Sequence, residues 1–322
     1  MSAALSANTD GKHVLALIAL PDATLDALRR GYTLHYHPDG WGEALSAGVD
    51  PVNVRAAVTN GSTGLSGAQM AALPALEIVS AFGAGYENVD MAAATRRGIV
   101  VTHAPGANAA TVADHAIGLL LALARGYAPL TEAVRAGRWR ASRAERPTLT
   151  GARLGLLGMG RIGRLIAARA QGFDMTLGYH GRQPHADAPG RYYADLIELA
   201  ANSDFLVIAC NGGAATKHLV SRKVLQALGP NGYVVNVSRG SVLDTQALID
   251  ALAHAAIAGA GLDVIEDEPE VPAALLDHPD VLITPHIAGR SPASMIAQRD
   301  ALLASLAQHF AHTPIEFAVR AA

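Results

Sequence analysis

Three segments in the second half of the chain place a polar side chain shortly after an apolar run. Arg239 lies in residues 235–240 (VNVSRG), Glu268 follows residues 261–264 (GLDV), and His286 follows a third apolar run. A guanidinium pairs with a carboxylate through two parallel hydrogen bonds, and an imidazole exchanges a proton near neutral pH. Taken alone, Arg239 or Glu268 would more commonly be part of a surface ion pair, and His286 could be a structural core histidine. Together they can anchor a small acid and move a proton.

A glycine-rich turn precedes these segments, with Gly158, Met159, Gly160, Arg161, Ile162 and Gly163 between an apolar run and a helical pattern. In such turns the first glycine allows the tight bend, the second lets the backbone approach a pyrophosphate, and the third lets helix and strand pack closely. Helix N-terminal amides then face the phosphates. Because the chain has 32 glycines, the pattern alone is weak. The flanking strand and helix favour dinucleotide binding over a structural turn.

The next predicted strand, residues 175–179, runs into His180, Gly181 and Arg182. An acidic residue commonly ends this strand when NAD is bound, because it accepts a hydrogen bond from the ribose 2′-hydroxyl. No acid is present here, and the two basic side chains can bind a 2′-phosphate. NADP(H) is therefore the preferred cofactor, with NAD(H) still possible. The alternative interpretation is that Arg182 is only a solvated loop residue.

Short apolar runs alternate with helical patterns along the whole chain, which is typical of parallel sheets covered by helices. We predict an α/β protein with two doubly wound parallel-sheet domains, a Rossmann cofactor domain inserted into a flavodoxin-like substrate domain. The expected boundaries give residues 1–103 with 290–322 as the substrate domain and residues 104–289 as the dinucleotide domain. The expected strands are residues 14–19, 56–59, 78–81, 99–102, 154–157, 175–179, 205–209, 233–237, 259–263 and 281–284.

The composition restricts the class of partner. The 25 basic residues nearly balance the 28 acidic ones, which argues against nucleic acid or a membrane surface as partner. The single cysteine excludes an intramolecular disulfide and fits a reducing, cytoplasmic location. The apolar runs at residues 13–20 and 116–124 are too short for a signal peptide or a membrane span, so we expect a buried strand and a buried helix.

With these motifs in this order, the sequence resembles the D-isomer-specific 2-hydroxyacid dehydrogenases. The resemblance covers nearly the whole chain and includes residues 83–90 (GAGYENVD), residues 108–114, the glycine turn and the three polar segments. Within the family the sequence is most similar to the glyoxylate/hydroxypyruvate reductases and their 2-ketogluconate reductase relatives. The residues that point there are 180–182 (HGR) and 59–61 (TNG).

The resemblance implies site roles. Arg239 would anchor the substrate carboxylate and polarise the keto oxygen, His286 would donate the proton, and Glu268 would pair with His286 and favour its protonated form. The backbone amides of Ala84 and Gly85, with Asn60 and Gly61 beside them, would bind the substrate. Cofactor-binding positions would be Thr111, Gly158, Met159, Gly160, Arg161, Ile162, Gly163, His180, Gly181, Arg182, Cys210, Asn211, Thr216, Val237, Ser238, Asp263, Ala288 and Gly289, with Asp263 at the nicotinamide carboxamide.

The implied activity is NADPH-dependent reduction of a small 2-oxo acid, such as glyoxylate or hydroxypyruvate, to the D-2-hydroxy acid. A homodimer is expected, with Trp139 matching a family segment that reaches toward the partner's substrate site. One alternative is a reductase of 2-ketogluconate or another longer 2-oxo acid. Another is a non-catalytic dinucleotide-sensing interaction protein, which we rank low because no interaction tail is visible.

Several features receive a structural interpretation. His35 and His37 lie two residues apart, but no third ligand is evident, so no metal site is expected. Asp114 and His115 open an apolar helix and are expected to pack or to lie at an interface. Cys210 is expected to be a small buried residue near the cofactor and not a nucleophile. Residues 210–213 (CNGG) replace a stretch that usually contains proline, and Ala84 is smaller than the usual residue there. Because of these two departures, the sequence does not predict the shape of the substrate.

Overall fold

The computed structural model describes residues 11–319 and divides the chain into two compact units. Unit 1 comprises the chain up to Asn108 together with the chain from Ser291, and unit 2 comprises Ala109–Arg290. The boundaries predicted from the sequence lie between residues 103 and 104 and between residues 289 and 290. Each unit contains one parallel sheet with helices on both faces, so the predicted α/β class is confirmed.

Unit 1 is built on five parallel strands in the order β2-β1-β3-β4-β5, the flavodoxin-like order. The strands are β1 His13–Ala16, β2 Thr33–Tyr36, β3 Val54–Thr59, β4 Ile78–Ala81 and β5 Val100–Thr102. Helices α1 Asp22–Gly31 and α12 Pro292–Phe310 pack on one face, where they bury Leu25, Leu28, Leu302 and Leu306. The other face is covered by α2 Trp41–Ser46, α3 Gly67–Ala71 and α4 Met91–Arg96.

Unit 2 has seven parallel strands in the order β12-β11-β10-β9-β6-β7-β8. Counted from β6, six of them follow the Rossmann order, and β12 extends the sheet at one edge. The strands are β6 Arg153–Leu157, β7 Thr176–His180, β8 Arg191–Tyr192, β9 Phe205–Ile208, β10 Tyr233–Asn236, β11 Gly259–Leu262 and β12 Val281–Ile283. Of these, only β8 has no counterpart among the predicted strands, because two residues are too few to show a period.

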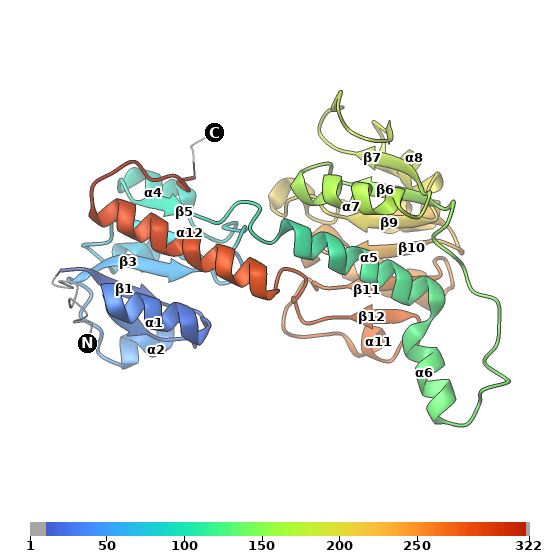
Figure 1. Ribbon diagram of the computed structural model, residues 1–322, viewed down its shortest axis with the longest axis horizontal. Helices are drawn as coiled ribbons and strands as arrows, with labels where there is room; N and C mark the ends of the chain where they lie inside the picture. Colours follow the sequence, from blue (N-terminus) through green and yellow to red (C-terminus); the bar gives the residue numbers. More distant parts are fainter. Residues whose placement is uncertain (1–10, 320–322) are drawn as a thin grey trace, which may run out of the picture. The chain divides into compact units, whose positions relative to one another are not determined.

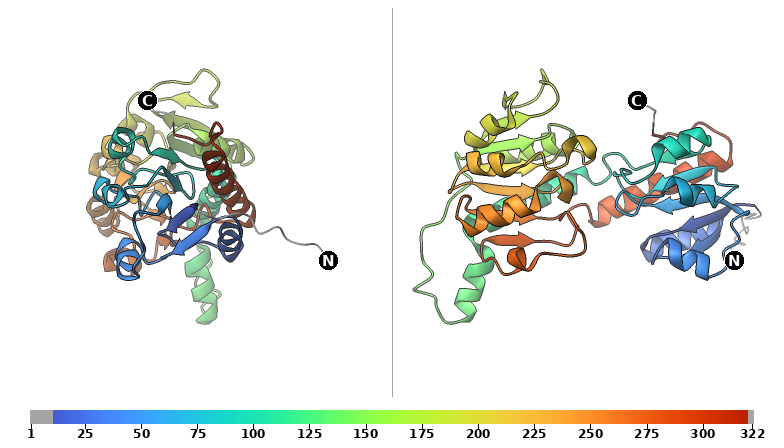
Figure 2. Two further views of the ribbon diagram at one scale, coloured as in Figure 1. Left: turned by 90° about the vertical axis from the view of Figure 1, so that its left-hand side faces the viewer. Right: turned by 180° about the vertical axis from the view of Figure 1, so that it is seen from behind.

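Helices cover both faces of the unit 2 sheet. Helices α5 Ala109–Arg125 and α7 Arg161–Gln171 lie side by side on one face (Figure 1). The opposite face, seen from behind in Figure 2, carries α8 Leu196–Ala201, α9 Arg222–Leu228 and α10 Thr245–Ala253. The shorter elements are α11 Ala273–Leu276, η1 Ala214–Thr216 and η2 Gly240–Val242. Helix α6 Tyr127–Arg135 projects away from the sheet (Figures 1 and 2).

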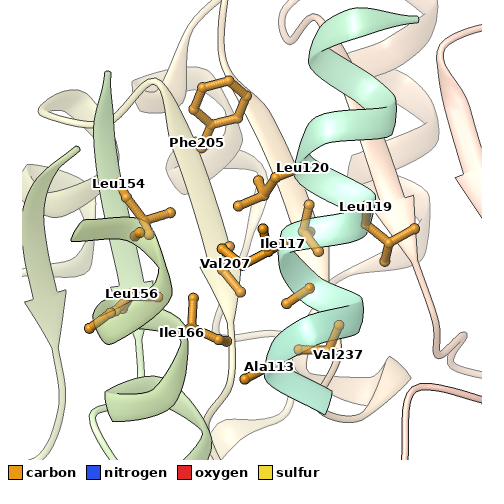
Figure 3. Close-up of a cluster of buried hydrophobic side chains, with 14 of the residues drawn as sticks. Ala113, Ile117, Leu119, Leu120, Leu154, Leu156, Ile166, Phe205, Val207 and Val237 are labelled. Atoms are coloured by element: carbon orange, nitrogen blue, oxygen red, sulfur yellow. The ribbon is translucent and has the colours of Figure 1, made fainter. Parts of the chain in front are cut away.

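The apolar run at residues 116–124 forms the C-terminal half of α5, the buried helix that was predicted. Ile117 and Leu120 point onto the sheet, where they meet Phe205 and Val207 of β9 (Figure 3). Each fully buried leucine or isoleucine of this kind contributes about 1.5–3 kcal/mol through burial. Among residues 11–319, no single helix has the length and apolar character of a membrane span. The α5–α6 pair, bent by 51°, meets those two criteria only when its helices are taken together.

Candidate active site

The candidate residues of unit 2 follow the carboxyl ends of its parallel strands. The glycine turn follows β6, His180 ends β7, and Cys210 comes shortly after β9. Arg239 follows β10, Asp263 directly follows β11, and His286 follows β12. Since the strands are parallel, these loops all lie at one edge of the sheet, which is where ligands bind in open α/β sheets. The topology thus gathers residues that are far apart in sequence.

The three glycines of the turn are required for three different reasons. Gly158 has φ +104°, and a Cβ there would lie 2.7 Å from the backbone of Cys210. A Cβ on Gly163 would lie 2.1 Å from the carbonyl oxygen of Gly158. A Cβ on Gly160 would meet no atom of the chain within 4 Å. The fold therefore explains Gly158 and Gly163, whereas the space beside Gly160 suits a ligand that approaches the backbone.

Gly160 is also the N-cap of α7, and no side chain caps the helix there. The first amides of a helix have no partner within the helix, and the helix dipole favours an anion at this end. Met159, beside it, is buried. The turn thus has the open backbone, the free amides and the local field that a pyrophosphate needs, and the dinucleotide fits these residues.

His180 lies next to the turn, because the amide of Gly158 donates to the His180 carbonyl over 2.9 Å. Its Nδ1 is 3.0 Å from the carbonyl oxygen of Tyr193. A carbonyl only accepts, so Nδ1 carries the hydrogen and the ring orientation is fixed. Arg182 is exposed, and within residues 11–319 it forms no hydrogen bond or ion pair. Both basic side chains are available to an anion at the end of β7.

The loop after β9 is tied to the loop after β10. The Ser238 hydroxyl donates to the Cys210 carbonyl over 2.5 Å, and the Thr216 hydroxyl donates to the Asn211 carbonyl over 2.9 Å. Burial raises the pKa of the Cys210 thiol to about 11, which leaves it protonated and unreactive at neutral pH. Cys210 is half-buried and packs against the core, in line with the structural role predicted for it.

Gly212 explains part of the unusual 210–213 stretch. A Cβ at this position would lie 2.6 Å from Cγ of Arg239, so the missing side chain makes room for the arginine stem. The guanidinium Nη1 of Arg239 donates to the Ser238 carbonyl over 2.7 Å. The loop that carries Arg239 is itself fixed by Asn236. This fully buried amide accepts from the Ser238 backbone over 3.1 Å and donates to the Arg239 carbonyl over 3.0 Å.

His286 and Glu268 form the contact that the resemblance implied, with Nδ1 of His286 2.8 Å from Oε2 of Glu268. The second carboxylate oxygen accepts from the amide of Ile265 over 3.1 Å. Burial acts to raise the pKa of Glu268. The hydrogen bond from His286, the charges of His286 and Arg239 and the Ile265 amide outweigh it and hold that pKa below its usual value. Glu268 is therefore ionised at neutral pH.

This pairing determines which ring nitrogen of His286 can reach a ligand. A carboxylate only accepts, so Nδ1 carries a hydrogen, and a proton exchanged with substrate must use Nε2. No hydrogen bond to Nε2 occurs among the described residues. The His286 side chain is 36% exposed and its backbone has φ +50°. A left-handed conformation is uncommon for a residue with a Cβ, and here it orients a side chain that the site uses.

Asp263 holds the His286 loop in this conformation. It is only 2% exposed, and Oδ1 accepts from the Thr284 hydroxyl over 2.6 Å and from the Ile287 amide over 2.9 Å. Oδ2 accepts from the Ala288 amide over 2.9 Å. A carboxylate has about four acceptor positions. Three are occupied, so one remains for a donor such as a nicotinamide carboxamide. Sequence reasoning gave Asp263 only the cofactor role.

His115 and Thr284 extend this network and were missed as site residues. The Nε2 atom of His115, on α5, lies 3.0 Å from the Thr284 hydroxyl and 3.6 Å from Oδ1 of Asp263. Asp114 pairs instead with Arg169 of α7 over 2.6 Å. Asp114 thus ties α5 to α7, whereas His115 joins the network around Asp263. Only the strand-end position of Thr284 could have suggested its part in the site.

Besides Arg239 and His286, the other four predicted substrate-binding residues lie in unit 1, also at the carboxyl edge of its sheet. Asn60 and Gly61 follow β3, and Ala84 and Gly85 follow β4. The Asn60 side-chain oxygen accepts from the Thr63 amide over 2.7 Å, and its NH₂ group, a donor, makes no hydrogen bond among residues 11–319. A Cβ on Gly61 would lie 2.8 Å from the carbonyl carbon of Gly85, so the two loops are in close contact.

The remaining candidates occupy the same edge of unit 2. Thr111 lies in the first turn of α5, Val237 and Ala288 are buried, and Gly289 follows Ala288. Within residues 11–319, no three His, Cys, Asp or Glu side chains gather as a metal site would require. His35 lies on β2, where its ring stacks on His13.

Comparison with known proteins identifies the family. Residues 117–288 match the family model described as D-isomer specific 2-hydroxyacid dehydrogenase, NAD binding domain. The chain belongs to this family. As a D-2-hydroxyacid dehydrogenase it is an oxidoreductase of the NAD(P)-binding type, and the recognition made from its motifs is confirmed.

Three relatives illustrate the range within the family. Hydroxyphenylpyruvate reductase of Plectranthus scutellarioides is 38% identical over 264 residues, covering 82% of this chain and 84% of that protein. The 2-ketogluconate reductase of Gluconobacter oxydans is 32% identical over 92% of this chain and 95% of its own length. The crystal structure of an NADPH-dependent glyoxylate/hydroxypyruvate reductase from Sinorhizobium meliloti, with NADP and malonate, has a TM-score of 0.89 at 36% identity, covering 97% and 100%.

Proposed function

We propose that this D-2-hydroxyacid dehydrogenase reduces a small 2-oxo acid, such as glyoxylate or hydroxypyruvate, to the D-2-hydroxy acid with NADPH. The observation that carries the proposal is the 2.8 Å His286–Glu268 pair at the sheet edge that also presents Arg239 and the glycine turn. The name of the Sinorhizobium meliloti relative, which couples this substrate class to NADPH, supports it.

In the proposed mechanism, Arg239 binds the substrate carboxylate and polarises the keto oxygen through its forked donors. A nicotinamide dinucleotide held at the glycine turn would supply the hydride that the keto carbon receives. His286 gives the proton on Nε2 to the developing alkoxide, and Glu268 stabilises the cationic imidazole before that transfer. Asp263, through the amides of Ile287 and Ala288, keeps the imidazole aimed correctly. In the oxidative direction His286 acts as the base.

The preference for NADPH rests on Arg182 and His180, which end β7 where an NAD enzyme would carry an acid. Replacing Arg182 by Gln removes a charge-assisted contact to the 2′-phosphate. The KM for NADPH should rise about tenfold to a hundredfold, while the KM for NADH stays unchanged. Lys223→Gln, an exposed change on α9, is the matched control. Equal effects on both cofactors would show that Arg182 does not recognise the phosphate.

A longer substrate is the second candidate, and Ala84 is the observation that favours it. Its small side chain lies in the loop proposed to bind the carboxylate, and relatives that reduce 2-ketogluconate and hydroxyphenylpyruvate are known in the family. Steady-state kinetics over a panel of glyoxylate, hydroxypyruvate, hydroxyphenylpyruvate and 2-ketogluconate, each with NADPH and NADH, decides between them. If the protein binds NADPH tightly but none of these acids causes NADPH to be oxidised, the result would instead support the dinucleotide-sensing alternative.

A homodimer and a cytoplasmic location complete the proposal. The segment around α6 exposes large apolar side chains, with Trp139 65%, Tyr127 55% and Val134 45% exposed. Exposed aromatic residues of this kind are enriched in protein interfaces. Sedimentation should give a dimer for the wild type and a weaker dimer for Trp139→Ala. A monomeric wild type would contradict this part of the proposal. The proposal of a cytoplasmic location rests only on the single cysteine of the sequence.

A further inference from the structure

Two successive carbonyls in the loop after β4 are held from the same side. The Gly83 carbonyl accepts from the Ala104 amide over 2.7 Å, and the Ala84 carbonyl accepts from Nδ1 of His103 at 2.8 Å. Because a carbonyl only accepts, Nδ1 of His103 must carry the hydrogen. The segment 103–104, which follows β5, therefore fixes the orientation of both peptide groups.

The orientation of a carbonyl determines the orientation of the next amide. In a planar trans peptide, the C=O of one residue and the N–H of the following residue point in opposite directions. The amides of Ala84 and Gly85 therefore both point away from segment 103–104. Neither amide donates to another group among residues 11–319. Successive unpaired amides of this kind form a concave site for an anion.

His103 is well placed to keep this geometry. The strands β4 and β5 that precede the two loops are hydrogen-bonded neighbours, and the buried Thr102 hydroxyl donates to Ser80 over 2.9 Å. The ring of Tyr86 meets the His103 ring edge-on, with centroids 5.0 Å apart. The backbone amide of His103 donates to the Phe317 carbonyl over 3.2 Å. The imidazole is thus held by its ring, its backbone and its strand.

We infer that His103 is a positioning residue for the carboxylate of the 2-oxo acid, which it acts on through the Ala84–Gly85 peptide group and not by direct contact. This inference rests on the proposed function. The amides of Ala84 and Gly85 bind the carboxylate oxygens, and His103 prevents the Ala84–Gly85 peptide from turning its carbonyl toward them. A turned peptide would replace a donor by an acceptor, which repels the anion.

The test uses two substitutions at His103. His103→Phe keeps an aromatic ring against Tyr86 but removes the donor, whereas His103→Gln keeps a side-chain donor. For His103→Phe, the KM for hydroxypyruvate and the inhibition constant for malonate should both rise about tenfold, the loss expected for one hydrogen bond. The kcat and the dissociation constant for NADPH should stay within twofold of wild type. His103→Gln should recover most of the loss.

The control is His312→Phe, a change of an exposed histidine in the same unit. Unchanged KM and malonate inhibition in His103→Phe would overturn the inference, as would equal losses in KM, kcat and NADPH affinity, which indicate general damage. If the wild type reduces no 2-oxo acid, the proposed function fails. Calorimetric binding of malonate to wild type and to His103→Phe then tests the inference separately, and equal or absent binding overturns it.

Discussion

The carboxyl edges of the two sheets present different chemistry. In unit 2 the edge presents side chains, with Arg239, Glu268 and His286 held by the buried polar groups of Asn236 and Asp263. In unit 1 the edge presents main chain, with the amides of a glycine-rich loop oriented by neighbouring strands. Proton transfer needs a titratable side chain, whereas a carboxylate can be bound by backbone amides alone. We therefore propose that two parallel sheets of different strand order divide the work, with proton transfer at the edge of unit 2 and carboxylate binding by main chain at the edge of unit 1.

The difference also appears in how conformational strain is used. His286 adopts a left-handed backbone conformation that costs a residue with a Cβ about 1–2 kcal/mol. The hydrogen bonds that Asp263 accepts from Thr284, Ile287 and Ala288 offset this cost. Gly83 has φ +121°, and because glycine lacks a Cβ this conformation carries no such penalty. Substitutions at His286 and Asp263 should therefore act on kcat, whereas substitutions that disturb the loop after β4 should act on the KM for the 2-oxo acid.

The largest effect is expected for His286→Ala. Removing the proton donor should lower kcat by about a hundredfold to ten-thousandfold, while NADPH binds as before. Steady-state rates with hydroxypyruvate and fluorescence titration of NADPH measure the two quantities. His312→Ala is a matched control, because His312 is exposed and also has a positive φ of 55°. Turnover of His286→Ala at the wild-type rate would show that another group supplies the proton.

Asp263→Asn should have the next largest effect. One oxygen of the buried carboxylate becomes an NH₂ group, so the bonds from Thr284 and Ile287 at Oδ1 and that from Ala288 at Oδ2 cannot all be kept. A buried unsatisfied donor costs about 1–3 kcal/mol, so kcat should fall about tenfold to a hundredfold. Asp277→Asn, on the exposed end of α11, is the control. An unchanged kcat would mean that the His286 loop keeps its conformation without Asp263.

Gly160→Ala separates cofactor binding from folding. The backbone there, with φ −79°, accepts an alanine, and the new Cβ meets no atom of the chain within 4 Å. The melting temperature should stay the same while the dissociation constant for NADPH rises at least tenfold, about 1.4 kcal/mol. Gly118→Ala, also with an open Cβ position but inside α5, should leave NADPH binding unchanged. If Gly160→Ala binds NADPH normally, the dinucleotide does not approach this turn.

The smallest effect is a shift in pH dependence. Glu268→Gln removes the carboxylate that pairs with His286, so the pH dependence that this carboxylate gives to stability should be lost. Because the folded-state pKa of Glu268 is lowered, the carboxylate stabilises the wild type above the unfolded-state pKa, and this stability is lost as pH falls through the folded-state pKa. Melting temperatures across acidic pH should show this loss in wild type and less of it in Glu268→Gln. Identical profiles would exclude the pairing.

Much of this fold could be predicted because its strands are apolar runs with clear ends. The run that became β4 has the predicted bounds, and ten predicted strands are present within a few residues. Motif residues such as Gly158 and His286 could be placed because each follows a strand. Two strands, β2 and β8, were not among those predicted. β8 could not be, since a two-residue strand has no measurable period and forms only by pairing with β7.

The supporting residues of the site were harder to find. His103, His115 and Thr284 act through contacts between segments that are far apart in sequence, with 169 positions separating His115 from Thr284. No local spacing encodes such a contact, because it depends on how helices pack on the sheet. Besides the strand-end position of Thr284, Asn236 gave a usable signal, because a polar residue in an otherwise apolar strand suggests a buried side chain with specific partners.

The central claim is that unit 2 delivers a hydride and a proton to a small 2-oxo acid. The most direct measurement is a single turnover, in which enzyme loaded with NADPH is mixed with excess hydroxypyruvate or glyoxylate. We expect the reduced nicotinamide to be consumed once per site and one D-2-hydroxy acid to form for each NADPH lost. Stable NADPH in the presence of every 2-oxo acid of the panel, with the cofactor still bound, would contradict the account.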